Sequence, residues 1–206
     1  MRRTILVFAI PATALIVTAA AASAPPQSVT IAASRPIVVY GASVTLSGKT
    51  SSAKANEKVD VLAEASGQTN LSALGSVPTT AGGQWTDVVK PTIETSYQAR
   101  WKSATSSTVT VKMRPQITFT LVKLSSGSFS TKVTAARSFA GKFVLVQRLT
   151  ATGATTLKKV TLDSSSAATF RVRLHHGRNR LRVLMPTSQA APGYITGMSK
   201  VLTVKR

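Results

Sequence analysis

The chain has 206 residues, no cysteine and a formal net charge of +20, with 26 Lys and Arg against six Asp and Glu. The lack of cysteine excludes disulfide bonds and a lipid anchor on a cysteine, so hydrophobic burial must hold the fold together. A chain of this length forms one large domain or two small ones.

Residues 1–24 have the features of a secretory signal peptide. Arg2 and Arg3 give the segment a positive start, and an apolar run then reaches about Ala22, where small residues offer a cleavage site. An uncleaved anchor is the alternative, since the run approaches the length that spans a membrane. We expect export to the cell surface or the medium, with membrane contact only in transit through this segment.

Most of the remaining first half alternates between apolar and polar side chains with a period of two. Thr, Ser and Val dominate, and no helical stripe is visible. This alternation predicts antiparallel strands with one face on a core and the other in water. The segments with this pattern are 44–48, 59–63, 97–101 and 108–113.

The second half shows the same pattern, with glycine-containing turns at short intervals. Many short strands separated by turns are typical of a β-sandwich. The expected strands are 117–121, 129–133, 143–146, 157–162, 170–174, 181–185 and 202–204.

The second half also repeats the plan of the first. Tyr97–Trp101 and Leu181–Met185 lie 84 residues apart and alternate in the same way. Such self-similarity indicates a duplicated structural unit. The other matches near this spacing are Val44–Leu46 with Phe129–Thr131, Lys58–Val59 with Lys142–Phe143, and Trp85 with Phe170.

The last strands of the two units, 108–112 and 201–205, are offset by 93 residues, so the second unit has about nine extra residues before its last strand. These extra residues fall within Pro186–Gly197. Long end loops of sandwiches are binding elements or tolerated insertions, and both interpretations stay open.

The boundary between the units falls at Pro115, which cannot donate a ladder hydrogen bond and therefore suits a position between domains. We predict an all-β protein with two tandem antiparallel sandwiches, one over 25–114 and one over 115–206. Because the linker is so short, the two units should lie end to end in a stiff rod.

The first unit resembles the bacterial Ig-like domains of secreted and cell-surface proteins. The likeness covers about 85 residues, and the second unit joins it mainly through the first. It implies an architectural role, as in adhesion stalks, spacers and accessory domains of envelope enzymes. The segments that carry it are Tyr40–Gly48, Ala81–Trp85, Lys90–Thr92 and Thr95–Ala99.

Two positions depart from this pattern. Asp87 lies two residues from both Trp85 and Val89, so a regular strand would turn it toward the core with them. A charged residue at such a place predicts a β-bulge or a position at the margin of a sheet. Leu181 stands in the second unit where the first has Tyr97.

Charge is distributed unevenly between the two units. Residues 25–114 have a net charge of +4, whereas residues 115–206 combine fifteen Lys and Arg with a single acidic residue, Asp163, for a net charge of +14. This asymmetry indicates a polyanionic partner for the second unit, or a basic surface that only keeps the protein soluble.

Arginines at alternate positions are the best candidates for binding a polyanion. Arg171 and Arg173 should project from one strand about 6.6 Å apart, and Arg180 and Arg182 from another. If the two strands belong to opposite sheets, the pairs lie on different faces; a solvated outer face is the alternative to a binding site. The full candidate set is Lys158, Lys159, Arg171, Arg173, Arg178, Arg180 and Arg182.

No residue pattern predicts catalysis, a cofactor or a metal ion. The acidic residues are scattered, whereas acid–base catalysis needs a carboxylate pair or an oriented histidine. His175 and His176 are adjacent, so on a strand they point in opposite directions and cannot easily share an ion. Trp85 and Trp101 alternate with polar residues, which places them in the core and not on a sugar-binding surface.

These features together predict a non-enzymatic structural or adhesion-type protein whose basic second domain contacts anionic envelope polymers. The alternative is a protein-binding accessory subunit of an envelope enzyme or transporter. We expect a monomer without specific nucleic-acid binding, because the protein is exported and its basic half lacks exposed aromatics for base stacking. Polymer binding should vanish in moderate salt, whereas binding to a protein partner should depend on the Pro186–Gly197 loop.

Overall fold

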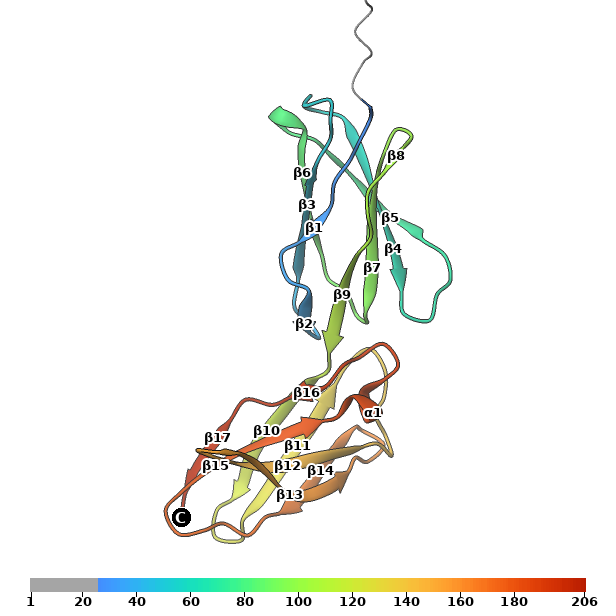
Figure 1. Cartoon of the computed structure of the whole chain (residues 1–206). Helices are drawn as coiled ribbons and strands as arrows, with labels where there is room; N and C mark the ends of the chain where they lie inside the picture. Colours follow the sequence, from blue (N-terminus) through green and yellow to red (C-terminus); the bar gives the residue numbers. More distant parts are fainter. Residues whose placement is uncertain (1–25) are drawn as a thin grey trace, which may run out of the picture.

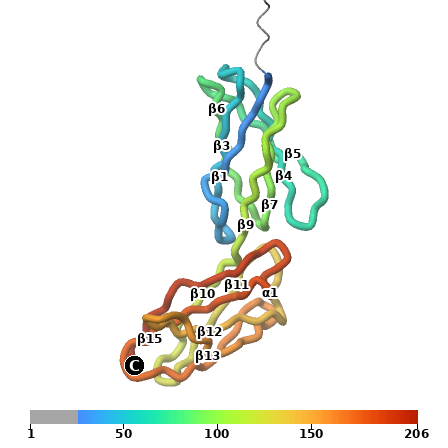
Figure 2. The backbone as a smooth tube through the Cα atoms, viewed as in Figure 1, coloured from blue at the N-terminus to red at the C-terminus, as the bar shows by residue number. Residues whose placement is uncertain are grey.

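The computed structural model describes residues 26–206, which form two β-sandwiches arranged end to end (Figures 1 and 2). The predicted signal peptide lies outside the described residues. The chain passes from one sandwich to the other at Pro115, between a strand that ends at Arg114 and one that begins at Gln116.

The first sandwich packs a three-stranded sheet, ordered β1-β3-β6, on a larger sheet ordered β2-β9-β7-β4-β5, to which β8 adds through β7. The pairings are antiparallel except that of β2 with β9. A short 3-10 helix, Ala81–Gly83, precedes β6. The strands are β1 (Ala32–Ala33), β2 (Ile37–Val39), β3 (Val44–Lys49), β4 (Lys58–Ala65), β5 (Ser72–Pro78), β6 (Gln84–Val89), β7 (Thr95–Trp101), β8 (Ala104–Thr105) and β9 (Val109–Arg114).

The second sandwich has the same plan. A sheet ordered β10-β11-β14 faces a sheet ordered β13-β12-β15-β16, in which β17 also pairs with β15. The predicted fold class, tandem antiparallel Ig-like β-sandwiches, is confirmed. Its elements are β10 (Gln116–Lys123), β11 (Ser128–Thr134), β12 (Phe143–Thr150), β13 (Gly153–Thr161), β14 (Ala167–Arg171), β15 (Arg178–Met185), α1 (Thr187–Ala190), β16 (Gly197–Met198) and β17 (Leu202–Lys205).

Each core consists of the side chains that the period-two pattern points inward. Trp85 and Trp101 are buried in the first sandwich, as predicted. In the second sandwich, the rings of Phe129 and Phe170 stack with centroids 6.4 Å apart. Full burial of one such apolar side chain contributes about 1.5–3 kcal/mol, so these residues supply much of the stability of a chain without disulfides.

Strand pairing corrects the alignment of the two repeats. Val44 pairs with Val89, and its counterpart Phe129 pairs with Phe170. Phe170 is therefore equivalent to Val89, and the predicted match of Trp85 with Phe170 is wrong by four residues. The offset between the units changes along the chain because the connections differ in length.

The match of Lys58–Val59 with Lys142–Phe143 is wrong by one residue. Val59 is fully buried, whereas Phe143 lies on the outer side of its sheet, where its ring contacts Lys159. The buried equivalent of Val59 is Val144. A shift of one residue turns every side chain of a strand to the other face, so only the structure fixes this register.

The predicted departure at Asp87 arises from a place at a sheet margin. β6 pairs regularly with β3, with Leu46 opposite Asp87 and no bulge, and β6 is an edge strand of its sheet. The second departure is Leu181, which stands where the first unit has Tyr97. It does not weaken the core, because both side chains are buried.

Several elements differ from the sequence prediction, among them the short strands β1, β2, β8 and β16 and the edge strand β6, which are not among the predicted strands. β14 ends at Arg171 and not at residue 174, because the chain leaves the ladder at Val172. β5 is exposed along almost its whole length and so lacks the alternation that predicts a half-buried strand. The helix α1 has only four residues, too few for a helical stripe.

The Pro186–Gly197 loop joins the two sandwiches. The amide N–H of Glu94 in the first sandwich donates to the carbonyl of Gly193, at 3.0 Å, and Ile195 N–H donates to the carbonyl of Met113, at 2.9 Å. In Figure 2 this part of the chain lies at the end of the second sandwich that faces the first. The extra residues of the second unit therefore form a junction between the sandwiches.

Tyr194 is the buried centre of this junction. Its hydroxyl donates to the carbonyl of Thr92 in the first sandwich and accepts a 3.1 Å hydrogen bond from Ala136 N–H in the second. Its ring packs edge-on against Phe139, with centroids 5.8 Å apart. One side chain thus holds loops of both sandwiches, which favours the stiff end-to-end arrangement that the short linker predicts.

Substitution of Gly193 by alanine tests the junction. Gly193 has φ +78°, and a Cβ there would lie 2.4 Å from Ile93 Cδ1 across the junction, whereas Gly141 has φ +73° and open space around it. Both alanine variants pay the left-handed backbone cost, about 1–2 kcal/mol. Gly193→Ala should lose about 1–3 kcal/mol more, because it also overpacks the junction.

Urea unfolding measures this difference. Tryptophan fluorescence reports the first sandwich, which holds both tryptophans, and circular dichroism reports both sandwiches. Equal destabilisation of the Gly193→Ala and Gly141→Ala variants would contradict a tightly packed junction.

Candidate functional site

Opposite charges are paired only in the first sandwich of the part of the chain that the structure describes. Asp60 accepts from Lys58 at 3.5 Å and Arg100 at 3.3 Å, and Glu57 accepts from Lys102 at 3.1 Å. Within 116–206, no Lys or Arg forms a salt bridge. The positive charge of the second sandwich is therefore not neutralised from within.

Asp163, the single acidic residue of the second unit, is engaged with its own turn. Its carboxylate accepts hydrogen bonds from the Ser165 hydroxyl (2.7 Å), Ser165 N–H (2.8 Å) and Ala167 N–H (3.0 Å). The Ser165 hydroxyl bond, followed by the Ala167 amide bond, lowers the pKa of Asp163 below its ordinary value. This carboxylate shapes the turn that leads into β14.

The predicted basic residues divide into two groups, because β14 and β15 belong to opposite sheets. The two arginine pairs therefore do not converge. The first group is on the outer side of the larger sheet, where the β15 arginines alternate with buried residues. We call this group the basic face; it consists of Lys159, Arg178, Arg180 and Arg182.

Two contacts hold side chains of the basic face in place. Arg182 Nε donates to Gln147 Oε1 on the neighbouring strand, at 2.9 Å. Lys159 Nζ lies 4.0 Å from the centroid of the Phe143 ring, a cation–π contact. Arg180 lies opposite Thr203 and Arg178 opposite Lys205, so the positive surface extends onto β17.

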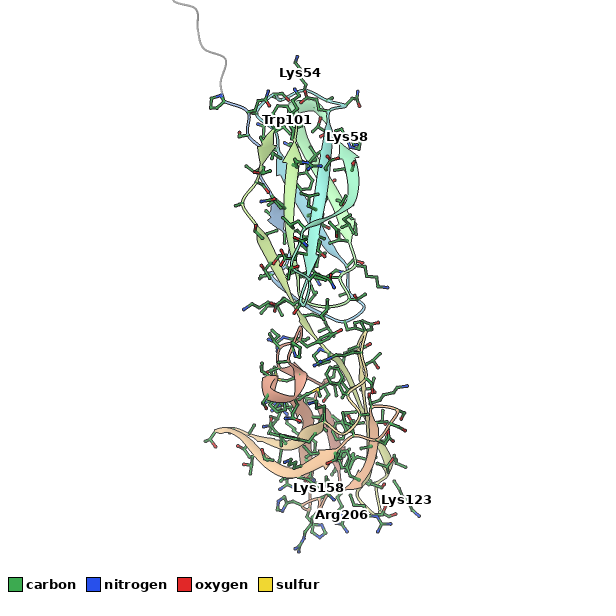
Figure 3. All side chains as sticks on the ribbon, turned by 90° about the vertical axis from the view of Figure 1, so that its right-hand side faces the viewer. Lys54, Lys58, Trp101, Lys123, Lys158 and Arg206 are labelled. Atoms are coloured by element: carbon green, nitrogen blue, oxygen red, sulfur yellow. The ribbon has the colours of Figure 1, made fainter. Side chains whose placement is uncertain are left out.

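The second group surrounds a cavity of about 240 Å³ at the seam between the edge strands β13 and β14. Lys158, Arg171 and Arg173 line it, together with Arg148 and His175. We call it the basic cavity. Figure 3 places Lys158 at the end of the molecule farthest from the first sandwich, near Lys123 and Arg206.

The two adjacent lysines of β13 lie on opposite faces of their sheet. Lys158 lies opposite the buried Val146, and Lys159 lies opposite Leu145 on the outer side. Successive side chains of a strand point to opposite faces. Lys158 therefore borders the cavity, while Lys159 belongs to the basic face. A β-bulge lies on the other side of Lys158, where Leu157 is extra between the pairs Lys158–Val146 and Thr156–Gln147.

Arg148 is the cavity residue that the sequence prediction missed. It lies on β12 opposite the fully buried Leu181, and its Nη2 donates to the carbonyl of Arg173 at 2.9 Å. Its Nε is buried and has no hydrogen-bond partner among residues 26–206. The alternation of Val144 and Val146 continues inward to Arg148, and this pattern could have identified it.

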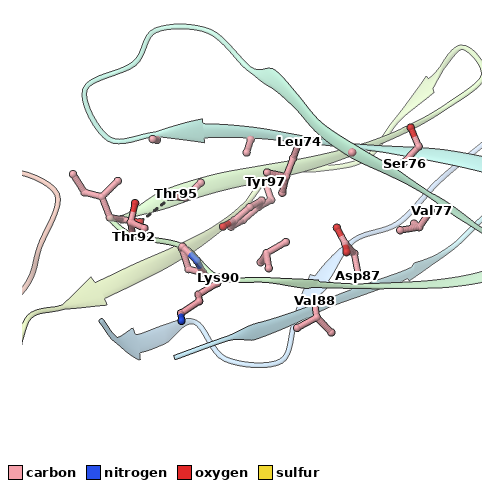
Figure 4. A pocket seen from close by; sticks show the side chains of 15 residues that line it. Leu74, Ser76, Val77, Asp87, Val88, Lys90, Thr92, Thr95 and Tyr97 are labelled. Carbon is pink, nitrogen blue, oxygen red and sulfur yellow. Dashed lines mark hydrogen bonds between the residues drawn. The ribbon is translucent and has the colours of Figure 1, made fainter. Parts of the chain in front are cut away.

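The equivalent seam of the first sandwich does not gather positive charge. A cavity of about 480 Å³ lies there between β5 and β6, and its apolar side chains, such as Val77 and Tyr97, are joined by one carboxylate, Asp87, and one cation, Lys90 (Figure 4). Ala63 lies opposite Tyr97 there, as Arg148 lies opposite Leu181 in the second sandwich. The same place in the two sandwiches thus holds alanine in one and arginine in the other.

Metal-ligating side chains are not clustered in the described part of the chain. No group of three or more His, Cys, Asp or Glu side chains within 26–206 could hold a metal ion. His175 borders the basic cavity, and its backbone N–H is bound by Asn179 Oδ1 at 3.0 Å. None of the helices described is long and apolar enough to cross a membrane.

No family model matches the chain, and no curated protein matches it. Among solved structures it is similar to a tetra-tandem repeat in the extending region of a large adhesion protein, with 12% identity and a TM-score of 0.37. That match covers 87% of this chain and 49% of the other, so the chain spans about half the length of the adhesion-repeat structure.

A second similar structure is native alpha-2-macroglobulin from Escherichia coli, spanning domains NIE-MG1. It matches with 12% identity and a TM-score of 0.28, over 84% of this chain and 95% of the other.

Replacement of Asp163 by asparagine should destabilise the protein at pH 7. Hydrogen bonds depress the folded-state pKa, so the stabilisation is present above the unfolded-state pKa of about 3.9 and is lost as pH falls through the folded-state value. The difference between wild type and Asp163→Asn should therefore shrink in strong acid. Urea unfolding at pH 7 and at low pH, followed by circular dichroism, measures it.

The matched control is Asp87→Asn, which removes the same charge from a carboxylate at the margin of the first sandwich. It should show a smaller change at pH 7. An Asp163→Asn effect of equal size at both pH values would contradict the role given to its charge.

Proposed function

We propose that this is a non-enzymatic, exported structural or adhesion-type protein whose second sandwich contacts anionic polymers of the cell envelope. The observation that carries the proposal is the unpaired charge of residues 115–206. They hold fifteen Lys and Arg, their one carboxylate is engaged with its own turn, and no salt bridge forms within 116–206. The sequence of residues 1–24 supports export.

A polyanion would meet this charge on two surfaces. Charges of one sign attract an oppositely charged polymer before contact, within a screening length of about 8 Å at physiological salt. At contact, the guanidinium groups of the basic face donate paired hydrogen bonds to phosphate, sulfate or carboxylate groups. The first sandwich then acts as a spacer that positions the basic sandwich.

Sequence-specific nucleic-acid binding is not part of the proposal. Binding of single strands relies on exposed aromatic rings on which bases stack. Within 116–206, every aromatic side chain is buried or partly buried, and several form the core. These residues are Phe119, Phe129, Phe139, Phe143, Phe170 and Tyr194.

Salt dependence of polymer binding tests the proposal. The purified chain should bind polyphosphate and polyglutamate of defined length, and a polymer that engages about four cations should give a log–log salt slope near −2.8. Removal of three cations should reduce the slope by about 2. Fluorescence titration between low and moderate salt measures it for the face variant, Lys159→Gln, Arg180→Gln and Arg182→Gln.

The matched control removes three exposed lysines of the first sandwich, which should leave the slope nearly unchanged. Its substitutions are Lys49→Gln, Lys54→Gln and Lys112→Gln. Equal losses in the two variants would mean that net charge alone drives binding. Binding that resists moderate salt would contradict the proposed function.

A second candidate function, an accessory subunit that binds an extended strand of a partner protein, is favoured by the seam of the first sandwich. β5 and β6 are both edge strands there, and Leu74 and Val88 beside the cavity are 52% and 68% exposed. An added strand would satisfy the free backbone groups of one edge and cover these side chains.

Leu74→Glu and Val88→Glu together should abolish salt-resistant capture of such a partner and leave polyphosphate binding intact. Affinity capture from cell-wall extract in high salt measures the first effect. Loss of polymer binding in the same variant would instead indicate misfolding, which circular dichroism would reveal.

A further inference from the structure

We propose that the basic cavity is a specific site for one tetrahedral oxyanion, a phosphate or sulfate group such as a polymer carries as an ester. This inference rests on the proposed contact with polyanions and deepens it. The basic face offers charge spread over a surface, whereas four cationic residues line a single small cavity.

Cationic residues of three strands line the cavity. Arg148 lies on β12, Lys158 on β13 and Arg171 at the end of β14, and Arg173 follows two residues beyond that end. No carboxylate lines the cavity. Its volume of about 240 Å³ lies below the usual range for small-molecule pockets, about 300–1,000 Å³, and so favours one charged group over a larger ligand.

Arg148 is held in place with most of its donors unused. Within 26–206, the guanidinium of Arg148 makes a single hydrogen bond, to the Arg173 carbonyl at 2.9 Å, although a guanidinium has five N–H donors. The Nε is buried without a partner. A partly buried cation without an opposite charge is unfavourable, and an oxyanion would remove that penalty.

The fold itself does not require an arginine at this position. Ala63 occupies the same place in the first sandwich, opposite Tyr97, and that sandwich buries its core equally well. An arginine that only filled space there would also be expected to pair with an acidic residue or to extend into water. Arg148 instead turns to the backbone beside Arg171 and Arg173.

A tetrahedral oxyanion suits this arrangement better than a planar carboxylate. A phosphate or sulfate group presents oxygens in several directions, and the cavity offers cations from three strands. Guanidinium groups bind such oxygens in pairs. A carboxylate directs both oxygens to one side and would engage fewer of these cations.

Titration with inorganic phosphate, sulfate and acetate at constant ionic strength tests the proposal. Nitrogen-edited NMR of the arginine Nε–Hε groups should show saturable shifts for Arg148, Arg171 and Arg173 with phosphate and sulfate. Arg178 and Arg180 of the basic face should not respond. Acetate should bind at least about tenfold more weakly, because it lacks charged hydrogen bonds that the tetrahedral ions make.

The cavity variant combines Lys158→Gln, Arg171→Gln and Arg173→Gln, and it should weaken phosphate binding by about tenfold for each charged hydrogen bond lost. A control of equal charge changes the basic face instead and should bind phosphate like wild type. Its substitutions are Arg178→Gln, Arg180→Gln and Arg182→Gln.

Arg148→Met keeps an apolar stem without the charge and should also weaken binding; if it does not fold, the cavity variant still decides. Absence of a saturable shift, equal shifts in face arginines, or equal binding of acetate would overturn the site. Polymer binding without phosphate saturation would remove the cavity and leave the proposed function. Lack of polymer binding would remove the proposed function, and the phosphate titration would still test the cavity.

Discussion

Burial of apolar side chains is the main interaction between the two facing sheets of each sandwich, because a chain without cysteine has no disulfide bond to join them. Alternate residues of the central strands serve this burial, and most core positions are therefore restricted to apolar residues. The restriction ends at the seams, where edge strands of the two sheets meet and the core opens to solvent. Both seam cavities, one between β5 and β6 and one between β13 and β14, lie there. Chemistry can vary at the seams without loss of the core.

The same constraint accounts for the junction. A single residue, Pro115, links the sandwiches, and a one-residue linker alone would not bury any surface between them. The loop around Tyr194 supplies that burial and adds backbone hydrogen bonds to both partners. The extra residues of the second unit therefore set the direction of the second sandwich. Its basic end is consequently held away from the first sandwich, as Lys158 and Arg206 show in Figure 3.

Alternation with period two predicted most strands, because a strand with one buried and one exposed face has alternating apolar and polar residues. β5 has no such alternation, since its side chains are exposed on both faces. The repeat predicted the plan but not the register, because a connection of different length shifts the offset without changing the pattern. For the candidate site, the spacing of two residues predicted that Arg171 and Arg173 lie on the same side of a strand. It could not place Lys158 at the same cavity, because that depends on which edges of the two sheets meet.

The two sandwiches have nearly the same plan but differ in charge. The difference in charge lies outside their cores. The first pairs two of its carboxylates, Glu57 and Asp60, with lysine and arginine on its surface, and its net charge is only +4. In the second, the one carboxylate, Asp163, is hydrogen-bonded within its own turn, so the lysines and arginines have no acidic side chain to pair with. At the seam, Arg148 of the second sandwich stands where the first has Ala63, while the residue opposite stays buried in both. Two sandwiches of one architecture can thus differ widely in charge, because burial fixes the strands while the seams and outer faces remain free to differ.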